Sequence, residues 1–249
     1  MRAIIFDSST IISLALNNFL WILQPLKEKY QGEFYITESI KKEIIDRPFQ
    51  IKRFKLESIQ ISNELNKGTL KVYTEQDLTK EIQELDTIAN HIFQGKNNFL
   101  KIIDEGELTA LALAKKINAQ ALVIDERTTR LLIESPASLN SLFRKKFNED
   151  IKIDQKNLKQ FKQMVGNIPI IRSVELSIAA YELGILDNYL PQKNQQTKRD
   201  LLDALLWSMR FKGCAISEKE MHEILKEELK QDSFLQRDKS KKKNIPTTR

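Results

Sequence analysis

The sequence predicts an α/β fold in which a central, mainly parallel sheet is flanked by helices. Short apolar runs, typical of buried strands, alternate along the chain with longer segments of helical periodicity. The 249 residues include only 7 glycines and 6 prolines, so helix should dominate between the strands. Hydrophobic residues make up 41% of the chain and charged residues 30%, which is the composition of a globular protein with a full core.

Five short runs are expected to form the strands of this sheet. The first run ends abruptly at Asp7, and the fourth ends at Asp125. Pro169 favours a sheet edge or a strand start for the last run, because proline donates no backbone hydrogen bond. The expected strands are 2–6, 33–36, 70–73, 121–124 and 168–171. Helical crossovers between them would keep neighbouring strands parallel.

The connecting segments carry helix caps and stops. Hydroxyl caps at Ser8 to Thr10 precede the apolar helical pattern that starts at Ile11, and Pro48 should end the helix after the second strand. Gly68 is a suitable stop for the helix before the third strand. The expected helices cover 11 onward, 37–45, 49–66, 77–93, 107–117, 127–134, 174–186, 198–211 and 217–230.

We expect one domain over residues 1–230. Residues 136–167 are polar, basic and weakly patterned, which indicates a basic helical insertion, and 191–199 is a smaller insertion. Extra helices should follow in the C-terminal part. Residues 231–249 form a basic tail with no apolar pattern to anchor it, so we expect the tail to be disordered.

The net charge of +6 is unevenly distributed. Residues 135–167 hold seven lysines and arginines against three acids, and residues 237–249 hold six against one. Contacts from Lys and Arg to phosphate supply most of the non-specific affinity for nucleic acid, so these two segments are candidates to grip a polyanion. The alternative is a solvated surface and an unattached tail.

Cysteine content and hydropathy suggest a cytoplasmic protein without a membrane segment. The only cysteine is Cys214, which excludes an intrachain disulfide and a cysteine-based zinc site. The longest apolar stretch near the start, 11–23, is interrupted by Ser13, Asn17 and Asn18 and has no basic leader. It therefore lacks the pattern of a signal peptide or a membrane span.

Four acidic residues are expected to converge at one edge of the sheet. In a parallel sheet, strand ends and the starts of the following helices meet at the same edge, where ligand sites collect. Asp7 and Asp125 end their strands, and Glu107 opens a helix directly after Gly106. Glu43 lies in the second turn of the helix that follows the second strand, within reach of the same edge.

Carboxylates crowded in this way call for a cation between them. Their mutual repulsion raises their proton affinity and destabilises the fold unless a positive charge compensates it. Hard oxygen ligands favour Mg²⁺ or Mn²⁺, and such ions activate water for phosphodiester cleavage. Any one of these acids taken alone is more often a helix cap or a surface charge, so the prediction depends on their shared edge.

Four stretches resemble the motifs of the PIN-domain family, and especially a prokaryotic subfamily close to VapC-type toxins. The resemblance extends over nearly the whole chain to Leu225. The opening IIFDSSTIISLA resembles the first motif, and ITESIKKEII resembles the second. IIDEGELTALALA is similar to the Asp-x-Gly-Glu signature of the subfamily, and ALVIDERTTR to the fourth motif.

The resemblance implies a PIN-like fold and a metal-dependent endoribonuclease with Mg²⁺ or Mn²⁺ as cofactor. The implied catalytic and metal-binding residues are Asp7, Glu43, Glu107 and Asp125, with Glu126 and Asp104 as further candidate ligands. Hydroxyls of Ser9 and Thr10 would support Asp7. Candidate RNA contacts are Arg127, Arg130, Arg144, Lys145 and Lys146.

Several functions stay open at this point. The ribonuclease is either the toxin of a toxin-antitoxin pair or an RNA-processing enzyme, with RNA as one partner and an antitoxin, another protein or a second copy as further candidates. A non-catalytic RNA-binding protein on the same fold is the alternative. An aspartate-dependent phosphatase ranks below both, because such enzymes typically need a second Asp two residues after the first, where Ser9 stands.

Overall fold

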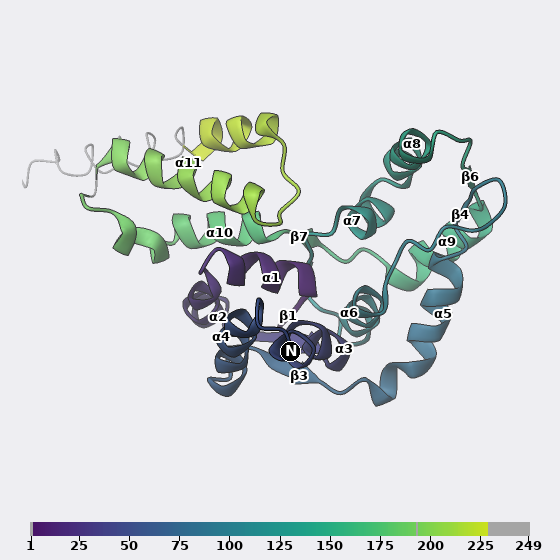
Figure 1. The fold of residues 1–249 in the computed structure, drawn as a ribbon, viewed down its shortest axis with the longest axis horizontal. Coiled ribbons are helices and arrows are strands. Elements are labelled where there is room, and N and C mark those ends of the chain that lie inside the picture. Colours follow the sequence, from purple (N-terminus) through teal and green to yellow (C-terminus); the bar gives the residue numbers. More distant parts are fainter. Residues whose placement is uncertain (1, 193, 229–249) are drawn as a thin grey trace, which may run out of the picture.

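The computed structural model describes residues 2–192 and 194–228, and its centre is a five-stranded sheet (Figure 1). All neighbouring strands of this sheet are parallel, in the order β3-β2-β1-β5-β7. The strands are β1 (Ala3–Phe6), β2 (Glu33–Thr37), β3 (Lys71–Tyr73), β5 (Ala121–Val123) and β7 (Ile170–Ile171). The predicted α/β class is confirmed, and β7 lies at an edge directly after Pro169.

Helices occupy most of the remaining described residues. The α-helices are α1 (Ser8–Leu16), α2 (Leu23–Tyr30), α3 (Glu38–Lys41), α4 (Lys55–Asn66), α5 (Thr79–Ala89), α6 (Glu105–Lys116), α7 (Arg127–Glu134), α8 (Pro136–Phe147), α9 (Gln155–Val165), α10 (Ser173–Glu182) and α11 (Gln195–Phe211). Residues 218–228 are also helical. A π-helical turn, Lys42–Asp46, continues α3, and 3₁₀ turns cover Leu20–Ile22, Pro48–Gln50, Glu75–Leu78 and Ile185–Tyr189.

Burial on both sides explains the composition of the central elements. All four residues of β1 are buried, and the Phe6 ring packs on Phe34 of β2 with centroids 5.0 Å apart. Helix α6 contacts β1, β2 and β5 and also α5 and α9. Its residues 108–114 are all buried, and alanine is frequent among them because sheet and helices approach it from several sides. Packing between the sheet and helices α5 and α9 fixes the position at which α6 begins.

Several predicted helices have different bounds in the structure; the one expected over 174–186, for example, ends at Glu182. The helix expected over 49–66 begins only at Lys55, after a 3₁₀ turn at Pro48–Gln50. The helix expected over 77–93 ends at Ala89, and Phe93 instead belongs to β4 (Phe93–Gln94), which pairs antiparallel with β6 (Lys152–Ile153). Phe93 is fully buried against the ring of Phe143, so long-range packing outweighs the local helical pattern.

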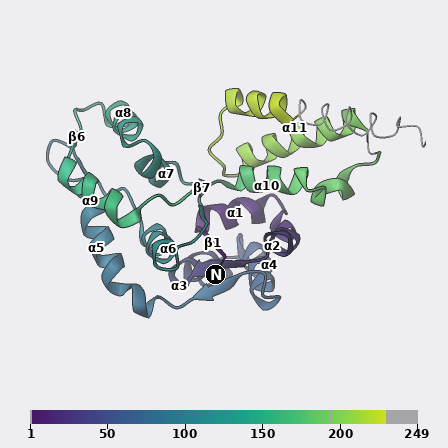
Figure 2. The same cartoon turned by 180° about the vertical axis from the view of Figure 1, so that it is seen from behind.

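The predicted insertion is folded and packs on the core. Residues 136–167 form α8, β6 and α9, and α9 contacts α5 and α6. Leu139, Phe143 and Phe161 anchor this segment because all three side chains are buried. Figures 1 and 2 place α8 and α9 on the opposite side of the molecule from α11. Of the expected smaller insertion, residues 195–199 already belong to α11. The tail expected to be disordered, 231–249, lies outside the described residues.

Within the described residues, no single helix is long and apolar enough to cross a membrane. Only α1 taken together with the segment 20–30 reaches that length and composition, and this pair is bent by 114°.

Candidate functional site

Asp7 stands at the carboxyl end of β1 and caps α1. The expectation of caps at Ser8 to Thr10 is wrong, because these residues already belong to the first turns of α1. The Oδ2 atom of Asp7 accepts hydrogen bonds from the backbone N–H of Ser9 at 3.0 Å and from the Ser9 hydroxyl at 2.6 Å. Its Oδ1 is buried and has no hydrogen-bond partner among the described residues. Burial raises the pKa of Asp7 to about 6, against the hydrogen bonds from Ser9, and the nearby charge of Glu43 adds to the rise.

Ser9 connects two of the strands that form this edge. Its Oγ donates to Asp7 and accepts a hydrogen bond from the backbone N–H of Asp125 at 3.0 Å. The hydroxyl of Ser9 therefore joins the ends of β1 and β5. Thr10, the other expected supporting residue, is fully buried, and its hydroxyl makes no hydrogen bond within the described part of the chain.

Glu107 lies in the first turn of α6, as its position after Gly106 predicts. Its Oε2 accepts a hydrogen bond from the backbone N–H of Asp104 at 2.8 Å, which closes the start of the helix. Burial raises the pKa of Glu107 to about 8, and the charges of Asp7 and Glu126 contribute to the rise. Three carboxylates from three separate segments thus share one electrostatic environment.

Glu43 reaches the same edge from the π-helical turn that continues α3. Its Oε1 accepts a hydrogen bond from the Ser8 hydroxyl at 3.1 Å. A Cβ atom on Gly106 would lie 3.0 Å from the other carboxylate oxygen of Glu43, so glycine leaves room for this side chain. Single π-helical turns inside helices are frequent at functional sites, and here the turn carries the candidate ligand.

Asp125 lies at the expected edge, but its carboxylate is already engaged. Oδ1 accepts the backbone N–H of Ser173 at 2.7 Å, and Oδ2 accepts the Ser173 hydroxyl at 2.6 Å. Asp125 therefore caps the start of α10 from a different strand, where a negative charge also complements the helix dipole. Glu126 caps α7 through the backbone N–H of Thr129 at 2.8 Å.

The geometry agrees with a comparison of the chain with protein families. The model of the family DUF3368, described as a PIN domain, matches residues 3–135, which is more than half of the chain. The chain belongs to the PIN-domain family. PIN domains are generally nucleases that use divalent metal ions. No curated protein and no solved structure matches the chain.

The matched part of this PIN-domain protein contains all four expected carboxylates and ends before α8. Ser173, which holds Asp125, lies beyond the match. Sequence reasoning missed Ser173 because it follows Asp125 by 48 residues and belongs to no local motif. Helices α8 to α11 all lie outside the matched segment, and α10 is joined to it through Ser173 and Asp125.

The other expected site residues of the PIN domain are exposed, except Arg130, whose side chain is only 17% exposed. Asp104 has an 83% exposed side chain that pairs with Lys101 at 2.8 Å. Arg130 pairs with Glu134 at 3.6 Å and Arg144 with Asp150 at 2.7 Å. Arg127, Lys145 and Lys146 are exposed. Two of the five candidate RNA contacts are thus engaged with neighbouring acids.

The donor set suits a hard divalent cation, although the side chains do not enclose one as they stand. Within residues 2–192 and 194–228, no three His, Cys, Asp or Glu side chains are grouped so that they could hold a metal ion. Burial, with a smaller contribution from neighbouring carboxylates, raises the pKa values of Asp7 and Glu107, so ionising both groups is costly without a cation. The buried, unpartnered Oδ1 of Asp7 is the atom that a cation would satisfy.

An open polar pocket lies beside these carboxylates. It has a volume of about 440 Å³, and Glu43 and Gly106 form part of its wall. The lining residues are Ser39, Lys42, Glu43, Arg47, Lys101, Asp104, Glu105 and Gly106. Lys42 and Arg47 are exposed and make no ion pair with a described residue. Mixed charges and an open shape suit a polar, extended ligand.

Proposed function

We propose that this PIN-domain protein is a metal-dependent endoribonuclease that hydrolyses RNA phosphodiester bonds. The observation that carries the proposal is the buried carboxylate of Asp7, whose Oδ1 lacks a partner beside the carboxylate of Glu107. A fold built only for stability would pair or expose these charges, because burying them unpaired is costly. Membership of a family whose members are generally nucleases supports the same function.

Mg²⁺ or Mn²⁺ is the proposed cofactor, held by Asp7, Glu43 and Glu107. Asp125 and Glu126 are the two candidates for a fourth ligand. Ser173 donates to both carboxylate oxygens of Asp125, whereas the cap of α7 uses only Oε2 of Glu126. When bound, such an ion supplies charge stabilisation at the phosphate and a water of lowered pKa. Oxygen donors without a nearby histidine favour these ions over zinc.

The residues of the chain itself position the donors and receive the RNA. The hydroxyl and backbone N–H of Ser9 fix one carboxylate oxygen of Asp7 and leave the other free. The backbone N–H of Asp104 orients Glu107 in the same way. Lys42 and Arg47 line the adjoining pocket, where cations can contact backbone phosphates of a bound strand.

Cleavage of end-labelled RNA of mixed sequence tests the proposal. The full chain is incubated with Mg²⁺ or Mn²⁺ and then with EDTA, alongside Asp7→Asn and the matched surface variant Asp200→Asn on α11. We expect internal cleavage that needs the metal, is lost in Asp7→Asn and persists in Asp200→Asn. Equal cleavage by Asp7→Asn and the parent would overturn the site assignment.

The same assay separates the catalytic function from RNA binding alone. A protein that only binds RNA would retain the RNA in Asp7→Asn and would show no cleavage in the parent with any divalent ion. For the biological role we propose either the toxin of a toxin-antitoxin pair or an RNA-processing enzyme. Growth arrest on expression, relieved by the product of a neighbouring gene, identifies the toxin.

A further inference from the structure

The insertion carries a surplus of unpaired positive charge on its surface. We define the arm as residues 136–165, which hold seven lysines and arginines and three acids. Two of the three acids serve the arm internally: Asp150 pairs with Arg144 at 2.7 Å, and Asp154 accepts the backbone N–H of Asn157 at 2.8 Å, capping α9. The third, Glu149, lies against the backbone of Gly95.

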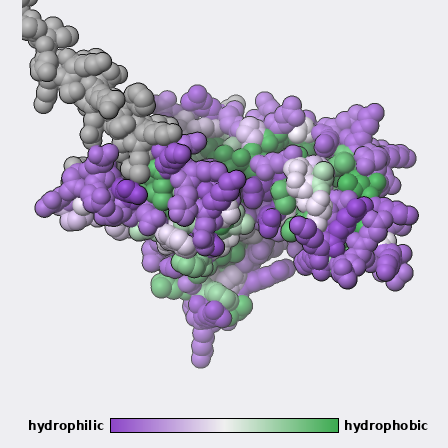
Figure 3. Space-filling model, turned by 90° about the horizontal axis from the view of Figure 1, so that it is seen from above, coloured by the Kyte–Doolittle hydropathy of each residue, from purple (hydrophilic) through white to green (hydrophobic). Residues whose placement is uncertain are grey.

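Six lysines of the arm are left without a carboxylate partner in the described part of the chain. All six side chains are exposed, and Lys146 lies over the ring of Phe147 at 5.5 Å. The six are Lys145, Lys146, Lys152, Lys156, Lys159 and Lys162. On the α8 side of the molecule, hydrophilic residues dominate the surface seen from above (Figure 3). The acids of the arm thus leave these six lysines unneutralised, and the surface of the arm is cationic.

Three of these lysines form a row along α9. Lys156, Lys159 and Lys162 follow at intervals of three residues, which keeps them on neighbouring positions of one helical side. The buried residues of α9, Phe161 and Val165, face the core instead. Lys159 and Lys162 also line a surface hollow of about 400 Å³. A regular row of cations beside a shallow hollow matches the charge pattern of a phosphate backbone.

The arm is joined through α7 to the edge that carries the carboxylates. Helix α7 begins at Arg127, directly after Asp125 and Glu126, and α8 follows it after Ser135. The eight residues of α7 and the twelve of α8 extend about 12 and about 18 Å. Helix α7 thus links the acidic edge to the arm over about 12 Å, a distance that an extended polyanion can span. The family match ends at residue 135, so the arm lies outside the matched segment.

We propose that the arm binds the phosphate backbone of single-stranded RNA outside the cleaved bond. This inference rests on the proposed function for its substrate class and adds the surface that holds the substrate. Lysine contacts to phosphates act without sequence preference, so the arm sets affinity and substrate length, and the acidic edge sets the chemistry.

The test measures RNA binding in the full chain without catalysis. The Asp7→Asn protein in EDTA is titrated with fluorescent single-stranded RNA of about 16 nucleotides, near the upper end of known single-strand footprints, over a range of salt concentrations. Lys159→Gln with Lys162→Gln is compared with Lys29→Gln with Lys52→Gln, two exposed lysines elsewhere that give the same change of net charge. Unchanged melting temperatures establish that each variant is folded.

We expect the arm variant to bind about tenfold more weakly near 0.1 M salt, with the salt slope reduced by about 1.4 for two lost phosphate contacts. The control variant should bind like the parent. Equal weakening in both variants, or no weakening in either, overturns the proposal. Tight binding of poly-glutamate of equal charge also overturns it, because the arm would then prefer acidic protein.

Cleavage assays keep this inference separate from the proposed function. With Mg²⁺ or Mn²⁺, the arm variant should cleave a short RNA of about 4 nucleotides at the parental rate and lose efficiency on the longer RNA. A chain that binds through the arm but never cleaves refutes only the nuclease. A chain whose arm variant cleaves and binds long RNA like the parent refutes only the arm.

Discussion

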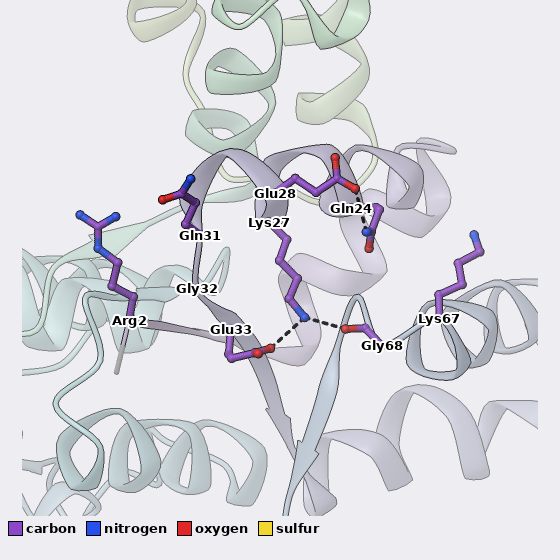
Figure 4. A pocket seen from close by; sticks show the side chains of 9 residues that line it. All are labelled: Arg2, Gln24, Lys27, Glu28, Gln31, Gly32, Glu33, Lys67 and Gly68. Atoms are coloured by element: carbon purple, nitrogen blue, oxygen red, sulfur yellow. Dashed lines mark hydrogen bonds and ion pairs between the residues drawn. The ribbon is translucent and has the colours of Figure 1, made fainter.

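The two edges of the parallel sheet differ in how their charged side chains are paired. At the amino edge, where β2 begins, a pocket of about 400 Å³ has Lys27 and Glu33 paired in its wall (Figure 4). Glu33 receives Lys27 at 2.8 Å and Lys71 at 2.9 Å, and Lys27 also donates to the carbonyl of Gly68 at 2.6 Å. At the carboxyl edge, which carries Asp7 and Glu107, a pocket of similar size is lined in part by Glu43.

The pKa values of the acids at these two edges are shifted in opposite directions. Hydrogen bonds from Lys27 and Lys71 hold the pKa of Glu33 below its usual value. Burial and neighbouring acids raise the pKa of Asp7 to about 6 and that of Glu107 to about 8. The amino edge is therefore arranged for stability, and the carboxyl edge retains a cost in stability that a bound cation can relieve.

The largest expected effect is the loss of cleavage on changing the carboxyl edge. Asp7→Asn keeps the shape of the side chain but removes the charge of a proposed metal ligand, so the rate should fall about 10³-fold or more. Glu33→Gln makes the same type of change at the amino edge and should leave the rate within about twofold of the parent. Initial rates with saturating Mg²⁺ measure both. Comparable losses in the two variants would show that the edges do not differ in function.

The second effect is an unusual pH dependence of stability in the metal-free protein. Because the folded pKa values of Asp7 and Glu107 lie above their ordinary values of 3.8 and 4.5, both groups favour folding while protonated. Their contribution is complete below pH 4 and is lost as the pH rises through about 6 and about 8. Glu33 has a lowered pKa in the folded protein, so its contribution to stability is lost as the pH falls through the acid range.

Melting temperatures measured from pH 5 to 9 in EDTA provide the check. We expect a decline over that range, which becomes shallower in the double variant Asp7→Asn with Glu107→Gln. Addition of Mg²⁺ at pH 8 should raise the melting temperature of the parent and leave the double variant unchanged. A flat profile for the parent would contradict the raised pKa values.

A third and smaller effect concerns the link between Asp125 and Ser173. Ser173→Ala removes the hydroxyl that donates to Oδ2 at 2.6 Å and keeps the backbone donor to Oδ1. A hydrogen bond to a charged group is worth about 1.5–3 kcal/mol, so unfolding in urea should show a loss of about 2 kcal/mol. Ser141→Ala, which removes an exposed hydroxyl on α8, should change stability by less than about 0.5 kcal/mol.

How far sequence reasoning reached depends on whether a feature is local. Asp7 and Asp125 end apolar strands, and Glu107 follows a glycine at a helix start, so the order of elements alone predicts their common edge. The strands are too short and too apolar to be confused with surface helices. Parallel pairing then follows from the helical crossovers, and the structure confirms it.

Features that depend on long-range packing were beyond sequence reasoning. The engagement of Asp125 by Ser173 joins residues 48 positions apart, and no pattern in the sequence connects them. The residues before Phe93 have a helical pattern, but Phe93 itself pairs as a strand residue with Ile153, which lies in the insertion. The role of Gly106 as space for Glu43 likewise appears only once α3 and α6 are placed side by side.

The smallest expected effect is the loss of one charge at the amino edge. The Glu33 side chain is 26% exposed, and ion pairs of this kind contribute about 1 kcal/mol or less because water already solvates them well. Glu33→Gln should therefore lower the free energy of unfolding by at most about 1 kcal/mol, and the difference should shrink near 1 M salt. Urea titrations at low and high salt measure this loss. A cost of several kcal/mol that is insensitive to salt would mean that Glu33 is desolvated like Asp7, and the contrast between the two edges would then rest on pairing alone.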